Sequence, residues 1–407
     1  MQIDVDTVKG FRDFLPPESI KRETVQKVIE KYFKIYGFIP IETPVIEFDE
    51  TMKPDILEGE TEDEAVSDRF RLKDRAGRNL GLRYEFTFQL ARILKQNPNI
   101  KMPFRRYQIG PVFRDEPISA DRFRQFIQCD IDIVGDSSVK ADAEVLAAVA
   151  DILKELKISS EIQVNNRKLL SAIIESCEIA EVKKVMRELD KIDKIGEDAV
   201  KTNLRIFADS NKILTLFKLL EKPLAFFEEN AFDGANELAE LQKLSNKYGL
   251  KIKFNPFMIR GLAYYTGNIF EVKETGKGSI AGGGRYDKSV GKFIKKEIPA
   301  VGISFGLERV TSLANIKPDA IPKILIISID QESESFGLTK KLRKESISCI
   351  MSDGSIGKSL EYANAYEIPF VIFVGEEEIS KSKFKLKNMT SGKEEMLTEK
   401  QLIARFS

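Results

Sequence analysis

Apolar and polar positions in the first hundred residues predict a helix followed by extended segments. From Glu18 to Tyr36 apolar residues recur every three or four positions, which predicts an amphipathic helix that ends at Gly37. The proline-containing segment 38–48 favours an extended chain at a sheet edge or an interface. Residues 70–83 have the pattern of a hairpin, and a further helix is expected over 87–95.

The middle of the chain combines a pair of long strands with a helical region. Strand patterns in 104–116 and 123–135, with a polar loop between them, predict an antiparallel pair. A helix over 141–156 and a short strand over 161–164 are expected to follow. From 166 to about 250 the pattern is helical and charged, which predicts a helical insertion.

Beyond the insertion the predicted elements change twice. Strand signals return in 257–272 and 279–287, and 300–310 has a helical pattern that contains glycines; these segments are expected to complete the first domain. After about residue 320 short strands and helices alternate, which predicts a small α/β domain with a buried, partly parallel sheet. Its expected strands are 323–329, 348–352 and 369–375, and its expected helices are 336–344 and 360–365.

The composition removes several classes of site. The chain has no histidine, which excludes a Ser/His/Asp triad and histidine metal ligands. Its 64 basic and 64 acidic residues cancel, so any RNA contact must be local. Cys129, Cys177 and Cys349 have no paired spacing, which argues against a disulfide framework or a zinc site and favours a reducing cytoplasm. Because no segment has the apolar run of a signal peptide or a membrane helix, we expect a soluble protein that is not bound to membranes.

Arginines are the candidates for binding phosphate in this chain. A Walker-type loop is absent, and Gly282-Gly283-Gly284 does not belong to a dinucleotide-binding pattern. A guanidinium stays charged and can bind two phosphate oxygens at once, which makes Arg114, Arg122, Arg260 and Arg309 candidates. A lone arginine is most often an exposed, solvated charge. Arg114 and Arg260, however, lie in runs with a buried pattern, where an arginine requires an anionic partner.

Three segments resemble the motifs of class II aminoacyl-tRNA synthetases. FRDE (113–116), followed by a loop and RFRQF (122–126), is similar to motif 2, and GLER (306–309) is similar to motif 3. The helix that ends at Gly37, followed by Pro44, resembles motif 1, which builds the dimer interface in that class.

Further segments narrow the resemblance to the histidyl-tRNA synthetase family. RGLAYYTG (260–267) and AGGGRYD (281–287) resemble its two signature segments, and LRYEFT (82–87) and QCDID (128–132) are similar to it as well. The resemblance implies an α+β catalytic domain built on an antiparallel sheet and interrupted by the helical insertion, with an α/β anticodon-binding domain after it. The two domains are expected over residues 1–320 and 321–407, with the insertion at about 166–250.

The resemblance implies that five side chains bind ATP. Arg114 binds the α-phosphate and is an implied catalytic residue, while Phe126 stacks on the adenine ring. Glu116 binds the adenine amino group, and Arg122 and Arg309 bind the β and γ phosphates. ATP is thus an implied substrate, with Mg²⁺ expected to accompany it.

The resemblance also implies a histidine pocket. Arg260 is the second implied catalytic residue and also a histidine-binding residue; it reaches the α-phosphate at a position where related synthetases use a metal ion, so no metal site is expected. The other implied histidine-binding residues are Glu85, Thr87 and Gln128 for the α-amino group, Asp132 and Tyr265 for the imidazole nitrogens, and Tyr264 in the pocket wall. The implied activity is the ligation of histidine to tRNA(His) through a histidyl-adenylate, by a homodimer.

Two positions bear on the place of the chain within the family. Position 263 is Ala where many members have aspartate, which puts in doubt any role of that carboxylate. Asp132 stands where one branch has glutamate, and together with LRYEFT it resembles the archaeal and eukaryotic branch.

Three alternatives remain open from the sequence. The first is the synthetase-like regulatory subunit of ATP phosphoribosyltransferase, which resembles the family but lacks the C-terminal domain and drops signature residues. The second is an RNA-binding or sensor module with an inactive site. The third is a class II synthetase for proline, threonine or glycine, which has the same type of C-terminal domain.

Overall fold

A computed structural model describes two compact units of the chain. The described residues are 5–52, 68–119, 122–259, 264–275, 278–318 and 320–406. The first unit consists of Met1–Phe14 and Val25–Ile316, and the second of Leu15–Thr24 and Lys317–Ser407. Among the described residues, no helix is both long enough and apolar enough to cross a membrane.

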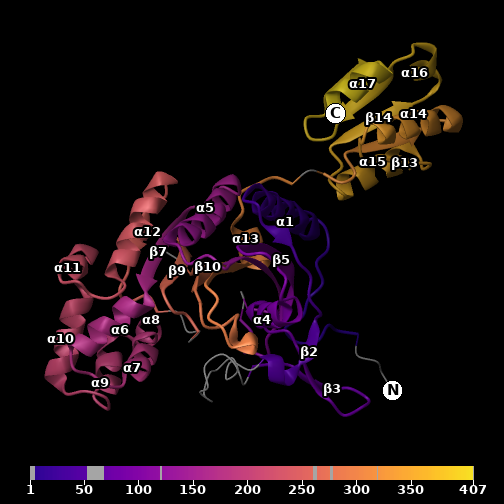
Figure 1. Ribbon diagram of the computed structural model, residues 1–407. Helices are drawn as coiled ribbons and strands as arrows, with labels where there is room; N and C mark the ends of the chain where they lie inside the picture. Colours follow the sequence, from indigo (N-terminus) through magenta and orange to yellow (C-terminus); the bar gives the residue numbers. More distant parts are fainter. Residues whose placement is uncertain are drawn as a thin grey trace. The chain divides into compact units, whose positions relative to one another are not determined.

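An eight-stranded sheet forms the centre of the first unit (Figure 1). Its strands lie in the order β1-β5-β6-β11-β10-β9-β7-β8, and all neighbours are antiparallel except the pairs β1/β5 and β7/β8. The predicted antiparallel pairing of two long strands, β5 and β6, is therefore confirmed. The strands are β1 (Ile39–Pro40), β5 (Phe104–Phe113), β6 (Gln125–Val134), β7 (Ser160–Asn166), β8 (Ile252–Phe254), β9 (Asn268–Glu274), β10 (Ser279–Arg285) and β11 (Ala300–Gly306).

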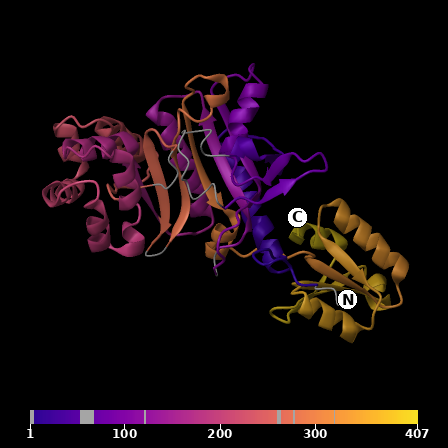
Figure 2. The same ribbon diagram turned by 90° about the horizontal axis from the view of Figure 1, so that it is seen from below.

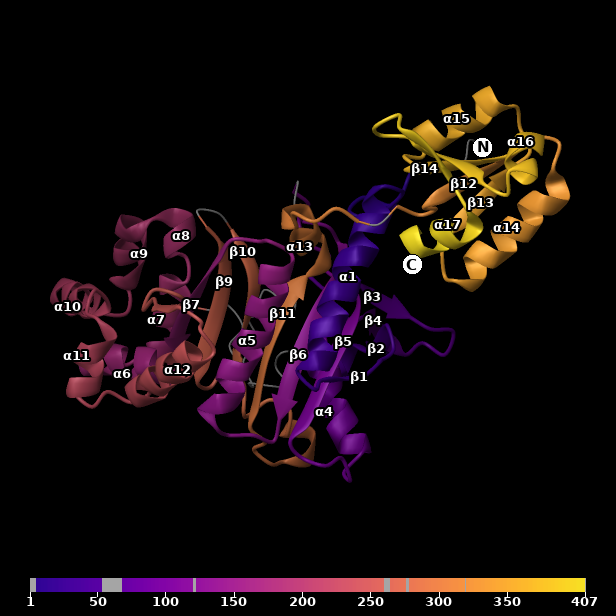
Figure 3. The same cartoon turned by 90° about the horizontal axis from the view of Figure 1, so that it is seen from above.

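Helices cover one face of this sheet (Figure 3). They are α1 (Glu18–Ile35), α5 (Val139–Glu155) and α13 (Leu307–Leu313). The Phe33 ring of α1 packs on Tyr107 of β5 and Phe305 of β11, with ring centres 5.4 and 6.0 Å apart. Cys129, Ile131 and Ile133 of β6 are fully buried in the same core. Because side chains alternate along a strand, Gln128, Asp130 and Asp132 are directed to the opposite face.

A group of short helices lies beside the β7–β8 edge of the sheet (Figures 1 and 2). They occupy the region predicted to be a helical insertion, between residues 167 and 247. The helices are α6 (Arg167–Ser176), α7 (Val182–Leu189), α8 (Ile192–Ile195), α9 (Glu197–Leu204), α10 (Ser210–Leu220), α11 (Leu224–Glu229) and α12 (Ala235–Lys247). Asn166 begins α6 by accepting hydrogen bonds from the backbone of Lys168 and Leu169, as a helix N-cap does.

A small three-stranded sheet and a helix lie between β1 and β5 in the sequence. The strands are β2 (Ile46–Phe48), β3 (Arg71–Lys73) and β4 (Asn79–Leu82), the helix is α4 (Thr87–Gln96), and a short 3-10 helix is η1 (Asp49–Met52). A second 3-10 helix, η2 (Lys292–Ile294), lies between β10 and β11. The predicted hairpin over 70–83 is confirmed as β3 and β4. Pro40 lies in an edge strand, as its missing N–H requires.

Two predictions of secondary structure were wrong. Residues 300–306 form strand β11 rather than helix, and the helix begins only at Leu307. The glycines in this segment serve close strand packing, because a Cβ on Gly302 would lie 2.0 Å from Asp132 Oδ1. The strand expected over 257–272 begins at Asn268; residues 257–259 and 264–267 are not strand, and 260–263 lie outside the described residues.

The second unit contains a five-stranded sheet in the order β13-β12-β14-β15-β16. The first three strands are parallel and the last two antiparallel, which confirms the predicted partly parallel sheet. The sequence did not predict β15 and β16. The elements are β12 (Ile324–Ser328), α14 (Glu332–Lys344), β13 (Cys349–Ser352), α15 (Ile356–Ala365), β14 (Phe370–Val374), α16 (Glu376–Ser380), β15 (Phe384–Asn388), β16 (Glu394–Leu397) and α17 (Glu399–Phe406).

The close approach of β10 and β11 predicts that Gly283 cannot be replaced without loss of stability. A Cβ at this position would lie 2.1 Å from the carbonyl oxygen of Gly302, a backbone atom that cannot swing away. We expect Gly283→Ala to lower the free energy of unfolding by about 1–3 kcal/mol, as overpacking does. Gly306→Ala is a matched control in the same sheet, since its Cβ would meet only the Phe126 ring at 4.0 Å. Urea denaturation measures both; equal stability of the two variants would contradict the expectation.

Candidate active site

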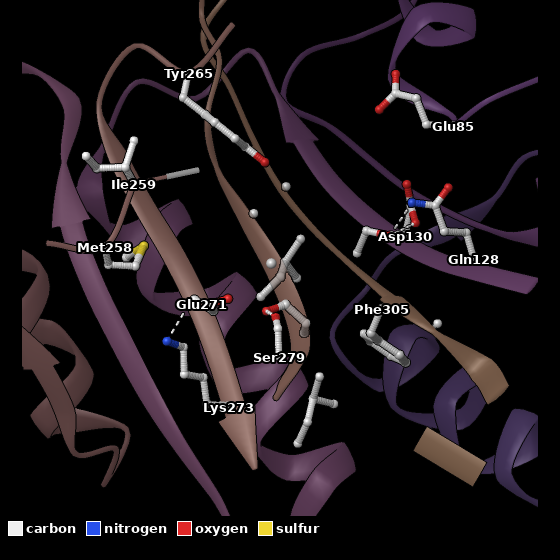
Figure 4. A pocket seen from close by; sticks show the side chains of 18 of the residues that line it. Glu85, Gln128, Asp130, Met258, Ile259, Tyr265, Glu271, Lys273, Ser279 and Phe305 are labelled. Atoms are coloured by element: carbon white, nitrogen blue, oxygen red, sulfur yellow. Dashed lines mark hydrogen bonds and ion pairs between the residues drawn. The ribbon is translucent and has the colours of Figure 1, made fainter. Parts of the chain in front are cut away.

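A cavity of about 600 Å³ opens on the face of the large sheet that the helices leave uncovered (Figure 4). Residues from β6, β9, β10 and β11, from the segment before α4 and from the helical insertion line it. In Figure 4 the Tyr265 ring reaches into the cavity from the side opposite Glu85 and Gln128. The sequence-predicted residues in its wall are Glu85, Thr87, Arg114, Arg122, Phe126, Gln128, Asp132, Tyr264 and Tyr265.

Three predicted residues do not belong to this wall as described. Glu116 contacts two residues that line the wall: its carboxylate lies 3.8 Å from Arg114 Nη1 and 3.4 Å from Arg122 Nη1. Arg309 Nη2 lies 3.5 Å from Glu274 Oε2 at the end of β9. Arg260 lies outside the described residues, as does Ala263.

The Arg114 guanidinium is held between two aromatic rings. Its Cζ atom lies 4.3 Å from the centre of the Tyr84 ring and 5.1 Å from that of Phe126, both within the range of cation–π attraction. The Tyr84 hydroxyl donates to Glu116 Oε1 at 3.3 Å. This arrangement fixes a permanent positive charge at the cavity wall, as a site for phosphate requires.

A buried ion pair lies at the wall of the cavity, where Asp132 lines it and Arg106 pairs with Asp132. Arg106 Nη2 lies 2.6 Å from Asp132 Oδ2, and both side chains are almost fully buried. The hydroxyl of Tyr286 donates to the other carboxylate oxygen of Asp132. Burial raises the pKa of the Asp132 carboxyl, and the Arg106 guanidinium and the Tyr286 hydrogen bond oppose that rise. Asp132 is thus oriented from two sides.

Glu85 and two tyrosines form the upper part of the cavity. Glu85 Oε1 accepts from the backbone N–H of Phe88 at 3.1 Å, and the Tyr264 hydroxyl donates to Oε2 at 3.4 Å. Burial raises the pKa of Glu85 above its usual value. The rings of Tyr264 and Tyr265 lie 4.9 Å apart, so they form one aromatic wall.

Not every residue of the AGGGRYD segment faces the cavity. Arg285 is buried and donates to the backbone oxygens of Asp136 and Ser138 at 2.9 Å each. It also pairs with Asp142 of α5. Arg285 therefore fastens α5 to β10, and its role is in the fold.

Sequence reasoning missed several polar residues at the site, among them Arg106, which pairs with Asp132, and the lining residues Asp130, Tyr286 and Ser304. Asp130 could have been found, because it lies midway between Gln128 and Asp132 on the same face of a predicted strand. Ser304 could not be, because its segment was predicted to be helical. It hydrogen-bonds both neighbours across the sheet: its hydroxyl donates to Asp130 Oδ1 and accepts from Gln128 Nε2 at 2.8 Å.

The pKa of Asp130 predicts a pH dependence of stability. Burial raises this pKa to about 8; Asp132 and Glu85 add to the rise, and Arg106 and Ser304 oppose it. Because the carboxyl ionises at a lower pH in the unfolded chain, the unfolded state binds fewer protons between about pH 4 and pH 8. Stability therefore falls as pH rises through this window.

Asp130→Asn removes that titration. We expect the melting temperature of the variant, relative to the wild type, to rise steadily from pH 5 to pH 8. Asp233→Asn, at an exposed position, controls for the loss of one carboxylate. Scanning calorimetry at several pH values measures the difference, and a difference that does not vary with pH would contradict the shifted pKa.

Known proteins resemble this chain in both of its predicted domains. Residues 10–310 match the model of the family described as histidyl-tRNA synthetase, and residues 323–407 match that of the anticodon binding domain. The chain is 37% identical over 417 residues to histidine–tRNA ligase 1 of Bacillus cereus, with 96% of this chain and 95% of that protein covered. It is 34% identical to histidine–tRNA ligase of Finegoldia magna, with 99% and 100% covered. Both relatives are bacterial, and the prediction of an archaeal and eukaryotic branch stays untested by them.

Solved structures show the same fold. Histidyl-tRNA synthetase from Nostoc sp. PCC 7120 superposes with a TM-score of 0.87 and 27% identity, over 100% of this chain and 99% of that one. A Bacillus halodurans protein described as an ATP phosphoribosyltransferase regulatory subunit/histidyl-tRNA synthetase has a TM-score of 0.76 at 20% identity, over 89% of this chain and 98% of that one, and shows the fold alone. With a family match over residues 10–310 and full-length relatives above 30% identity, the chain belongs to the histidyl-tRNA synthetase family.

Proposed function

We propose that this chain activates histidine with ATP and transfers it to tRNA(His). The observation that carries the proposal is the cavity, whose wall combines an arginine in contact with two aromatic rings and a buried, oriented carboxylate. The first suits a phosphate and the second suits a ring N–H. The curated relatives of similar length, which are named histidine–tRNA ligases, support the same activity.

On the ATP side, Arg114 neutralises the α-phosphate while the histidine carboxylate attacks it and pyrophosphate leaves. Charge gathers on the phosphoryl oxygens in this step, and a fixed guanidinium stabilises it without reorganisation. The proposal assigns Phe126 to the adenine ring and Glu116 to its amino group. Arg122 and Arg309 are assigned to the β and γ phosphates, and Arg260 to the α-phosphate and the histidine.

On the histidine side, Asp132 accepts a hydrogen bond from one imidazole N–H. Each of its oxygens already has one partner, Arg106 or Tyr286, and keeps a second lone pair for the ligand. Tyr265 is assigned to the other ring nitrogen, and Tyr264 to the wall. Glu85, Thr87 and Gln128 are assigned to the α-amino group. A ligand that lacks one of the two ring nitrogens would leave a buried polar group unpaired, so the cavity would discriminate against that ligand.

Transfer to tRNA follows without a protein base in this proposal. The terminal ribose hydroxyl attacks the adenylate carbonyl, the bond to the phosphate oxygen breaks, and the leaving phosphate takes the proton. A chain without histidine can therefore complete both steps. Mg²⁺ is expected to arrive with ATP, held mainly by phosphate oxygens and water.

The proposal extends to domains, assembly and location. It places the catalytic domain over residues 1–320 and the anticodon-binding domain over 321–407, in line with the unit boundary after Ile316 and the family match from residue 323. A homodimer is supported by apolar side chains left exposed around the motif 1 segment, a feature of interfaces. They are Ile35, Ile39, Val45, Ile46 and Phe48. A cytoplasmic location agrees with this activity.

Exchange of pyrophosphate into ATP tests the function directly. We expect exchange to depend on histidine and on no other amino acid. Stimulation by proline, threonine or glycine would assign a different synthetase, and no stimulation by any amino acid would favour a regulatory subunit or an inactive RNA-binding module.

Arg114→Lys should reduce activation strongly while the fold is retained. Lysine carries a point charge that cannot bind two phosphate oxygens at once, and it lacks the planar group that contacts the Tyr84 and Phe126 rings. We expect kcat for exchange to fall by roughly 100-fold or more, the scale of one transition-state contact. Arg78→Lys, an exposed arginine of the β3–β4 hairpin, is the control. If the two variants are equally active, Arg114 has no part in the reaction.

A further inference from the structure

One carboxyl group in the cavity has no role in the proposed reaction. Asp130 lies on β6 between Gln128 and Asp132, lines the cavity and is 5% exposed. Strand β11 places Ser304 directly opposite it in the sheet register. Figure 4 shows Asp130 and Gln128 side by side in the cavity.

The hydrogen bonds among these residues have a defined direction. When the Asp130 carboxyl is ionised it can only accept, so the single hydroxyl proton of Ser304 is donated to Asp130 Oδ1. The oxygen of Ser304 is then left to accept, and it accepts from Gln128 Nε2 at 2.8 Å. The amide of Gln128 is thereby oriented with its nitrogen toward Ser304 and its oxygen away from it.

The oriented amide presents an acceptor that lacks a donor. Gln128 Oε1 is buried, and within the described part of the chain it has no hydrogen-bond partner. A buried acceptor without a donor is costly, so the site is suited to a ligand that brings one. The ammonium group of an amino acid has three donors and a positive charge, and it would meet Oε1 with Glu85 close by in the same cavity.

We propose that Asp130 and Ser304 are positioning residues for the α-ammonium group of the substrate, which act by fixing the Gln128 amide with its oxygen toward that group. The inference rests on the proposed function only in taking an amino acid as the ligand. It does not depend on which side chain that amino acid has, because the α-ammonium group is common to all of them. Neither residue is required to touch the substrate.

The test compares two ligands that differ only in the ammonium group. Histidine and its des-amino analogue, 3-(imidazol-4-yl)propionate, are titrated by calorimetry into the wild type, Ser304→Ala and Ser304→Thr, at a pH above the pKa of Asp130 so that its carboxyl is ionised. We expect Ser304→Ala to weaken histidine roughly tenfold, the scale of a hydrogen bond to a charged group, and to leave the analogue unchanged. Ser304→Thr keeps the hydroxyl and should restore histidine binding. Equal weakening of both ligands, or no weakening of either, would overturn the proposal.

Asp130→Asn tests the same role by changing the hydrogen-bond partner of Ser304. The asparagine amide can donate to Ser304, which frees the serine proton to turn toward Gln128 and allows the amide to flip. Histidine should again weaken while the analogue does not, and the KM for ATP should stay at its wild-type value. A rise in both KM values would indicate a general loss of structure and count against the proposal.

The wild-type titration separates this inference from the proposed function. If the wild type binds histidine and supports exchange while the variants bind both ligands normally, only the positioning role fails. If the wild type binds a different amino acid, the same comparison is made with that amino acid and its des-amino form. If it binds no amino acid, both proposals fail together.

Discussion

The buried pair of Arg106 and Asp132 is the interaction around which the cavity is organised. The two residues stand directly opposite each other on β5 and β6, and the next strand, β11, places Gly302 opposite Asp132. A buried carboxylate is tolerated only with a charged partner and further hydrogen bonds, which Arg106 and Tyr286 supply. Loss of Arg106 would leave the buried Asp132 carboxylate without its charged partner. The chemistry of the cavity and the stability of the sheet therefore depend on the same contact.

The same pair helps three carboxyl groups to lie close together in one cavity. Burial raises the pKa of Glu85, Asp130 and Asp132, and the Arg106 guanidinium favours the ionised form of both aspartates. One arginine thus offsets part of the repulsion among three acids. Arg114 adds a second positive charge that lowers the pKa of Glu85, and a cationic ligand would add a further one beside these acids.

The sequence predicted those parts of the fold and site that depend on local pattern. The amphipathic helix over 18–36, the antiparallel pair β5/β6 and the alternating strands of the second unit each follow from periodicity, and the structure confirms them. Segment 300–306 was wrongly predicted to be helical. Its glycines are required because neighbouring strands approach closely, which no local sequence pattern reveals. Arg106 was missed for a similar reason: Arg105, its neighbour, bonds Glu144 on the opposite face, and only the strand register distinguishes the two. The roles of the individual site residues stay predictions, with Arg260 outside the described residues.

The glycine at position 302 has a consequence for how this site can change over time. Its missing side chain leaves the space that the Asp132 carboxylate occupies, since a Cβ there would overlap Oδ1. Backbone spacing thus leaves room for the Asp132 carboxylate, and a side chain at position 302 would displace the group that we propose binds the imidazole ring. Substitutions are tolerated more readily at exposed positions of the cavity, because side chains such as Arg122 are not confined by the sheet. A descendant that prefers a different ligand would therefore carry substitutions at exposed positions and keep Gly302 and Asp132.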